Sequence, residues 1–168
     1  MQTTKKWVKT GKFNFSFQDN NQEIGTMEIA SGTMERKAIA KFEEQTIVIK
    51  KTGLWKNILE LTDTKGQIIA KAFHEKWYAN SLILEYNNKK YKLLIRNNPL
   101  AEWVIQYNNE DLLAYGLSTK NGKAYIRITT ITDKADYLLD FILWYLFVPI
   151  AAEQGADDFT FLALLCAQ

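Results

Sequence analysis

The chain has 168 residues, 47% of them hydrophobic and 24% charged, and its 21 basic and 19 acidic side chains leave a formal net charge of +2. This length and composition suit one globular domain over residues 1–168, and the small net charge gives no reason to expect a nucleic-acid partner. One cysteine and one histidine exclude an intrachain disulfide framework and a zinc or iron–sulfur site built from those residue types. No metal and no cofactor are expected.

The amino-terminal segment carries four lysines with no apolar stretch behind them: Lys5, Lys6, Lys9 and Lys12. A secretory signal needs such a stretch, so a cytoplasmic location is expected. With Trp7 among them, the lysines could lie on an anionic membrane surface, where each basic residue contributes about 1 kcal/mol. The preferred alternative is an edge strand whose lysines discourage aggregation. These four lysines are the candidate binding residues that the sequence offers.

Apolar and polar residues alternate from Trp7 to Ile131, as in Phe13–Phe17 and Tyr91–Ile95. Alternation with period two indicates half-buried strands. Turn clusters separate the strands, and the first five are spaced by about 22 residues, which is enough for two strands. We expect about eleven antiparallel strands over residues 6–131, each joined to its neighbour. The clusters are Asp19–Asn21, Phe42–Gln45, Asp63–Gly66, Asn87–Lys89, Asn108–Asn109 and Asn121–Gly122.

Three of the expected hairpins resemble one another, since each has an apolar strand, an Asn/Asp turn and a second apolar strand. Their first strands contain Phe15–Phe17, Leu59–Leu61 and Trp103–Ile105. Internal duplication explains this likeness, and so does the general similarity of hairpins in any β-meander. The sequence leaves both explanations open.

A segment from Tyr137 to Val148 has Asp140 as its one charged residue. Asp133 and Asp136 stand where N-caps and first-turn acids belong, so a helix over about 134–152 is predicted, with Pro149 and Gly155 marking its end. Because the segment is apolar on every side, protein or lipid must surround it. A membrane span needs about 20 apolar residues and this run has about 16, so burial in protein is favoured over insertion in a membrane.

These elements predict a mostly-β fold, an antiparallel barrel of about 11–12 strands enclosing a hydrophobic C-terminal helix. A helix is about 10–12 Å wide with its side chains, and a barrel of more than eight strands has room for it. A short apolar element at about 158–167 then follows, as a twelfth strand or a second short helix.

The hairpins and terminal helix resemble the tubby C-terminal-like superfamily, which includes tubby-like proteins, phospholipid scramblases and LURP-one-related proteins. The residues that carry the resemblance are Gly53–Ile58 ahead of Asp63–Ile68, followed by the Tyr137–Val148 helix. The resemblance implies a closed barrel threaded by a helix. Members of the superfamily are associated with binding phosphoinositides or other membrane lipids, with membrane-linked signalling, or with no assigned activity. The apolar stretch Asp158–Ala167 departs from that pattern. No position matches a ligand motif of the family, so no binding residue is carried over.

Few residues suggest chemistry. His74 has no second histidine or cysteine near it in sequence and is interpreted as a surface or hydrogen-bonded histidine, while Cys166 lies in an apolar setting that raises thiol pKa and favours inert packing. Residues 116–124 lack the spacing of a phosphate-binding loop and are interpreted as part of a hairpin. The adjacent acids are interpreted as solvated turn residues: Glu43–Glu44, Glu110–Asp111 and Asp157–Asp158.

Asp140 is the anomaly of the helix, because a carboxylate among apolar residues costs several kcal/mol unless it is paired. The preferred interpretation gives it a partner, such as an inward Arg, Lys, Tyr or Asn from a strand, or a place at the mouth of the barrel. A functional carboxylate is the alternative.

We therefore expect no catalytic residues and a non-enzymatic, tubby-like or LURP-one-like module. It would bind membrane lipid headgroups or a protein partner, from the cytoplasm and at the membrane periphery. There are three alternatives: a barrel-type carrier of a small apolar ligand, an enzyme whose catalytic residues are not recognisable in the sequence, and a tail-anchored membrane protein.

Overall fold

The computed structural model describes residues 5–30, 37–54, 57–76, 80–97, 100–120, 123–131 and 136–153. The chain divides into two compact units, Met1–Tyr91 and Lys92–Gln168, called unit 1 and unit 2 below. The single domain over residues 1–168 stays a prediction.

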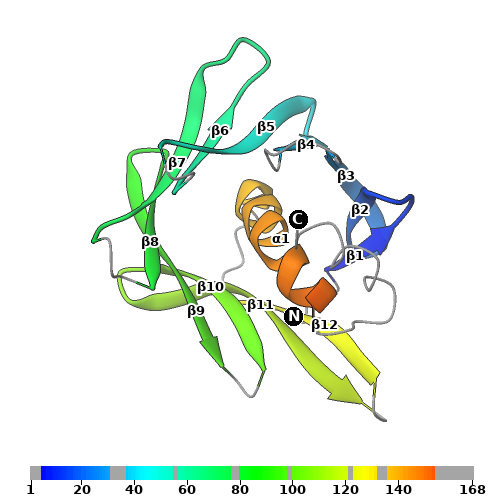
Figure 1. Cartoon of the computed structure of the whole chain (residues 1–168). Coiled ribbons are helices and arrows are strands. Elements are labelled where there is room, and N and C mark those ends of the chain that lie inside the picture. Colours follow the sequence, from blue (N-terminus) through cyan, green and yellow to red (C-terminus); the bar gives the residue numbers. More distant parts are fainter. Residues whose placement is uncertain are drawn as a thin grey trace. The chain divides into compact units, whose positions relative to one another are not determined.

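Twelve strands form one sheet whose strand order is the chain order (Figure 1). Neighbouring strands pair antiparallel wherever their register is resolved, as in β1–β2 and β11–β12. The strands are β1 (Lys6–Lys9), β2 (Asn14–Asp19), β3 (Gln22–Ile29), β4 (Lys37–Phe42), β5 (Gln45–Thr52), β6 (Ile58–Thr62), β7 (Ile68–His74), β8 (Ser81–Tyr86), β9 (Lys89–Asn97), β10 (Ala101–Tyr107), β11 (Glu110–Lys120) and β12 (Lys123–Thr130).

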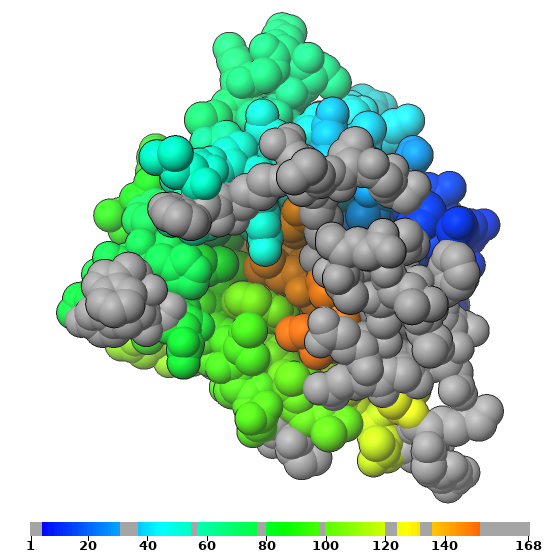
Figure 2. All heavy atoms as spheres, viewed as in Figure 1, coloured from blue at the N-terminus to red at the C-terminus, as the bar shows by residue number. Residues whose placement is uncertain are grey.

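One helix, α1 (Tyr137–Glu153), follows the sheet and packs against β10 and β11 of unit 2. Figure 2 shows the orange atoms of α1 directly against the yellow-green atoms of these strands. The predicted fold class is therefore confirmed: the described residues are mostly β, with twelve antiparallel strands followed by one helix.

The alternation in the sequence becomes two faces of the sheet. In unit 1 the apolar face carries fully buried side chains such as Phe15, Phe17, Ile49 and Leu84. Residues between them, such as Lys41, lie on the opposite side, which we call the polar face. In strands such as β4 and β5, buried residues thus alternate with exposed or half-buried ones, as period-two alternation requires.

The hairpin turns are also where the sequence places them. Their central residues have positive φ: Asn20 and Asn21, Glu43 and Glu44, Asn87 and Asn88, Asn108 and Asn109. Positive φ at both central positions is the backbone of a type I′ turn, whose twist matches that of the flanking strands. Asparagine tolerates this conformation, whereas glutamate does so at a cost, so the Glu43–Glu44 turn is strained relative to the others. The turn at Asn121–Gly122 lies outside the described residues.

The three similar hairpins share a structural irregularity. The β2–β3, β6–β7 and β10–β11 pairings each shift register after Phe17, Leu61 and Ile105, which are 44 positions apart in sequence. In each case the shift leaves one half-buried aliphatic residue of the second strand without a partner: Ile24, Ile69 and Leu112. β-Bulges are specific features rather than random defects. Their recurrence at one spacing supports internal duplication, with a unit of four strands.

The helix is buried as predicted. All residues from Leu138 to Val148 are buried, and Leu143, Trp144 and Phe147 have no exposed surface. The carbonyl of Asp136, just before the helix, accepts a hydrogen bond from the N–H of Leu139 (3.1 Å).

The helix ends at Glu153, within one residue of the predicted end at about 152, and Pro149 lies inside it. A proline removes one hydrogen bond, but Val148 and Ala151 on either side of it stay buried, so packing keeps the last turn helical. Asp133, Gly155 and the apolar element at 158–167 lie outside the described residues.

Candidate functional site

The four candidate lysines lie in and around the first strand of unit 1. Lys6 and Lys9 belong to β1, Lys5 precedes it, and Lys12 lies between β1 and β2. Lys6 and Lys12 are exposed and Lys5 and Lys9 half-buried. Since β1 is the first strand of the sheet order and pairs with β2, the edge-strand interpretation agrees with its position.

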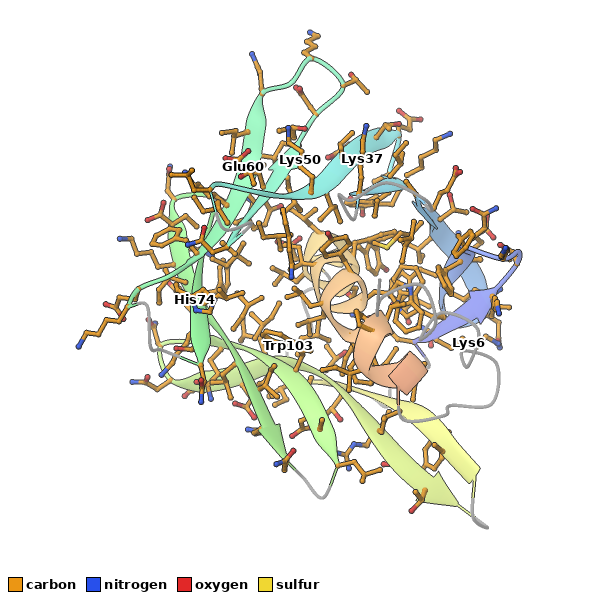
Figure 3. All side chains as sticks on the ribbon, in the orientation of Figure 1. Lys6, Lys37, Lys50, Glu60, His74 and Trp103 are labelled. Atoms are coloured by element: carbon orange, nitrogen blue, oxygen red, sulfur yellow. The ribbon has the colours of Figure 1, made fainter. Side chains whose placement is uncertain are left out.

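The two faces of β1 differ. Lys6 and Val8 share one face, where Val8 keeps 37% of its surface exposed. Trp7 and Lys9 share the other, and the ring of Trp7 lies 4.9 Å from that of Phe17. Lys6, labelled in Figure 3, donates a hydrogen bond from Nζ to Oδ1 of Asn21 (3.0 Å). The exposed face of β1 therefore presents an ammonium group beside an apolar side chain.

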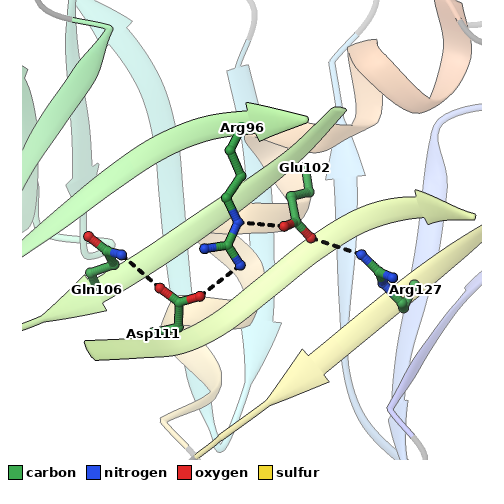
Figure 4. Close-up of polar contacts among 5 residues, drawn as sticks. All are labelled: Arg96, Glu102, Gln106, Asp111 and Arg127. Atoms are coloured by element: carbon green, nitrogen blue, oxygen red, sulfur yellow. Dashed lines mark hydrogen bonds and ion pairs between the residues drawn. The ribbon is translucent and has the colours of Figure 1, made fainter. Parts of the chain in front are cut away.

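A second cluster of charges, which the sequence did not single out, crosses strands β9 to β12 of unit 2 on one face of the sheet (Figure 4). Arg96 of β9 lies opposite Glu102 of β10, which lies opposite Gly116 of β11, which lies opposite Arg127 of β12. Directly opposed residues share a face, so the sheet register places both arginines beside one carboxylate.

Glu102 is the buried centre of this network, with 2% of its side chain exposed. Nε of Arg96 donates to Oε1 of Glu102 (2.5 Å), and Nη2 of Arg127 donates to Oε2 (3.1 Å). Arg96 also pairs through Nη2 with Oδ2 of Asp111 (2.7 Å), whose Oδ1 accepts a hydrogen bond from Nε2 of Gln106 (2.7 Å). Two guanidinium groups and two carboxylates thus form a balanced cluster spanning four strands.

Glycine at position 116 makes room for the buried carboxylate. A Cβ atom there would lie 2.8 Å from Cβ of Glu102 and 3.1 Å from its Oε2. Glycine inside a strand often marks such a close approach. Together with a lone glutamate in an apolar strand, Gly116 is the one signal in the sequence that points to this network.

The network shifts two pKa values. The pKa of Asp111 lies below its ordinary value of 3.8, first because Gln106 donates a hydrogen bond to its carboxylate and then because Arg96 lies beside it. The pKa of Arg96 lies above its ordinary value, chiefly because its guanidinium donates a hydrogen bond to Glu102. Both groups are therefore held in their charged forms.

The lowered pKa of Asp111 predicts a small acid-dependent loss of stability. A carboxyl group with a lowered folded-state pKa stabilises the fold fully above its ordinary value of 3.8, and this contribution is lost as pH falls through the folded-state pKa. We expect Asp111→Asn to lower the free energy of unfolding by no more than about 1 kcal/mol near neutral pH, because Arg96 is partly exposed, and expect the difference to shrink below about pH 4. Urea denaturation across this range measures it. The exposed neighbour Glu110, changed to Gln, is the control, and a difference that persists unchanged in acid would contradict the prediction.

The anomalous Asp140 has a strand partner of the kind expected. It is 1% exposed, and the hydroxyl of Tyr115 on β11 donates to its Oδ1 (2.8 Å). The Tyr115 ring also lies 6.4 Å from that of Trp144, edge to face, and 6.3 Å from that of Phe147. Tyr115 therefore joins the helix to the sheet of unit 2 by one buried hydrogen bond and two aromatic contacts.

The remaining candidates do not form a reactive cluster. His74 is exposed at the end of β7, and Glu43 and Glu44 are exposed at their turn. Glu110 is exposed as well, whereas Asp111 is half-buried and ion-paired, so the solvated-turn interpretation is wrong for Asp111. Cys166, Asp157 and Asp158 lie outside the described residues. Within the described ranges, no group of three or more His, Cys, Asp or Glu side chains could hold a metal ion.

A shallow hollow of about 400 Å³ lies over the β8–β9 turn of unit 1. Ile69 and residues 85–90 line it, and Nζ of Lys90 lies 3.3 Å from Oε1 of Glu85. The lining is mainly polar, so the hollow does not suit an apolar cargo.

Comparison with known proteins identifies no matching family model, no curated protein and no solved structure. In the part of the chain that the structure describes, no helix has the length and hydropathy to span a bilayer.

Proposed function

We propose that this protein is a non-enzymatic module of the tubby-like or LURP-one-like kind that docks on anionic membrane surfaces through the exposed face of β1. The observation that carries the proposal is the pairing of exposed Lys6 with exposed Val8 on one face of an edge strand. Basic groups attract anionic lipids and apolar groups insert among headgroups, so interfacial binding uses both.

The charge distribution supports this assignment. Unit 1 contains fifteen basic and ten acidic residues, a net charge of +5, whereas unit 2 contains six basic and nine acidic residues, a net charge of −3. Unit 1 therefore attracts anionic surfaces more strongly than the net charge of +2 for the chain suggests. The cytoplasm, at the membrane periphery, is the location that we propose.

We assign the buried acids to the fold rather than to chemistry. Glu102 is held by two arginines and Asp140 by Tyr115, so both carboxylates have structural partners. Catalytic acids are usually found where a substrate can reach them. The structural partners of Glu102 and Asp140 therefore favour binding over catalysis as the role of the protein.

The test is co-sedimentation of the protein with lipid vesicles of neutral phosphatidylcholine and of phosphatidylcholine mixed with phosphatidylserine. We expect binding to the anionic vesicles alone, weakening as salt is raised, because salt screens exposed charges. The quadruple variant Lys5→Gln, Lys6→Gln, Lys9→Gln, Lys12→Gln should bind at least tenfold more weakly, since each lysine near the surface contributes about 1 kcal/mol.

A matched control removes the same charge elsewhere. Residues Lys65, Lys76, Lys89 and Lys92 are exposed and lie outside β1, and their quadruple change to Gln should leave most of the binding intact. Equal loss in both variants would show that net charge alone drives binding. That result, or no binding to any vesicle, would rule out the β1 surface.

A further inference from the structure

A row of charged residues crosses the polar face of unit 1, one residue from each strand from β4 to β9. The cross-strand pairs are Lys37↔Lys50, Lys50↔Glu60, Glu60↔Lys71 and Lys71↔Glu85, and Glu85 forms an ion pair with Lys90. Directly opposed residues point to the same side of a sheet, so these side chains form one continuous row.

The signs alternate along the row except at one end. Positive and negative residues follow one another from Lys50 to Lys90, but Lys37 and Lys50 are two like charges directly opposite each other. On the far side of Lys37 the row continues with Ala30, whose N–H donates to the carbonyl of Lys37 (2.7 Å). Like charges opposed across two strands destabilise a sheet. Among the described residues of the row, Glu60 faces Lys50 from its other side and no acid faces Lys37, so this end of the row carries an excess of positive charge.

Figure 3 labels Lys37, Lys50 and Glu60, which lie on consecutive strands. Lys37 is exposed and Lys50 half-buried. An anionic group placed between Lys37 and Lys50 would complete the alternation of positive and negative charges along the row. The two ammonium groups could therefore bind the oxygen atoms of one carboxylate or phosphate group.

The next rows of the same hairpin extend this surface. Ile39 lies opposite Val48, with both side chains half-buried, and Lys41 lies opposite Thr46. Successive rows on one face are two residues apart, which is about 6.6–6.8 Å. The hairpin thus presents a basic, an apolar and a basic position at the spacing of alternate side chains in an extended chain. We call these five residues the β4–β5 face: Lys37, Ile39, Lys41, Val48 and Lys50.

We propose that the β4–β5 face binds an acidic peptide segment of a partner protein in extended conformation. Two acidic side chains of the segment, four positions apart, lie against Lys37–Lys50 and against Lys41, and the apolar side chain between them lies on Ile39 and Val48. The match in spacing favours a peptide over a membrane, because a fluid lipid surface has no fixed interval between its charges. Charge complementarity also favours it, since in these three rows the three lysines of β4 and β5 outnumber the two acids on the flanking strands, Glu28 of β3 and Glu60 of β6.

The experiment is a titration of the ¹⁵N-labelled full-length protein with a synthetic peptide, followed by two-dimensional NMR. The probe carries the core Glu-Ser-Val-Ser-Glu between Gly-Ser ends, and the comparison peptide has the same composition in the order Glu-Glu-Val-Ser-Ser. We expect amide shifts concentrated in β4 and β5, and at least fivefold weaker binding of the rearranged peptide. The variant Lys37→Gln/Lys50→Gln should also bind the first peptide at least fivefold more weakly.

Two controls separate this surface from the others. The exposed lysines Lys65 and Lys92, changed to Gln together, should leave peptide binding unchanged, as should the quadruple change in and around β1. The proposal would be overturned if the two peptides bound equally tightly. It would also be overturned if the Lys37→Gln/Lys50→Gln variant bound the first peptide as tightly as the unchanged protein does. So would a loss of vesicle binding in that variant without any peptide binding, which would assign the face to the membrane. Because the vesicle and peptide assays use different variants, either proposal can fail while the other stands.

Discussion

Replacing Glu102 with glutamine is expected to lower the free energy of unfolding by about 2–4 kcal/mol. The carboxylate is buried and accepts from Arg96 at 2.5 Å and from Arg127 at 3.1 Å. Glutamine removes the negative charge and turns an amide N–H₂ group toward at least one guanidinium, which leaves two cations close together. Water reaches both arginines, at 37% and 36% exposure, and this keeps the loss below that of a fully buried pair.

Urea denaturation at neutral pH measures the effect, with Glu110→Gln as the control for an exposed glutamate in the adjoining part of unit 2. That control should change stability by less than about 0.5 kcal/mol. If Glu102→Gln matched the control, the ion pairs would contribute nothing to stability, and the role assigned to this carboxylate would be wrong.

The second large effect concerns Tyr115 and Asp140. Tyr115→Phe should cost about 1–3 kcal/mol, because a buried carboxylate loses a hydrogen bond. Asp140→Leu should cost a similar amount, because the buried hydroxyl of Tyr115 then loses its acceptor, although an apolar residue suits the rest of the helix surface.

The double variant Tyr115→Phe/Asp140→Leu should be more stable than the sum of the single losses predicts, with a coupling of at least about 0.5 kcal/mol. Replacing both partners of a buried polar pair with apolar groups is often neutral or stabilising. Thermal or urea unfolding of the four proteins completes the cycle, and Tyr125→Phe, at an exposed tyrosine of β12, controls for loss of a hydroxyl. Strict additivity would mean that the 2.8 Å contact carries no energy of its own.

Local patterns made most of the fold predictable. Phe15 and Phe17 alternate with polar residues, and the asparagine pairs mark tight turns, so both strand and turn positions follow from the nearest neighbours in sequence. The helix followed from the unbroken apolar run around Leu143, and its polar partner from the cost of burying Asp140. Pro149 does not stop the helix, because its neighbours Val148 and Ala151 stay buried and packing outweighs the local rule.

The two charged surfaces could not be predicted in the same way. Glu102 meets Arg96 and Arg127 only because four strands share one register, and that register includes a bulge after Ile105. Lys37 and Lys50 oppose each other for a similar reason. A shift of the strand register by one residue moves every side chain to the other face of the sheet. Contacts across several strands therefore cannot be predicted from composition or alternation alone.

Pairing between successive strands also has a consequence for biogenesis. Each strand after the first pairs with the strand that is synthesised just before it. Successive hairpins can therefore form one at a time while the ribosome is still translating the chain. Helix α1 emerges after β11 is complete, and Trp144 and Phe147 then meet a Tyr115 that is already held in place. We therefore expect assembly to run in the same direction as translation, with α1 docking after β11 has formed.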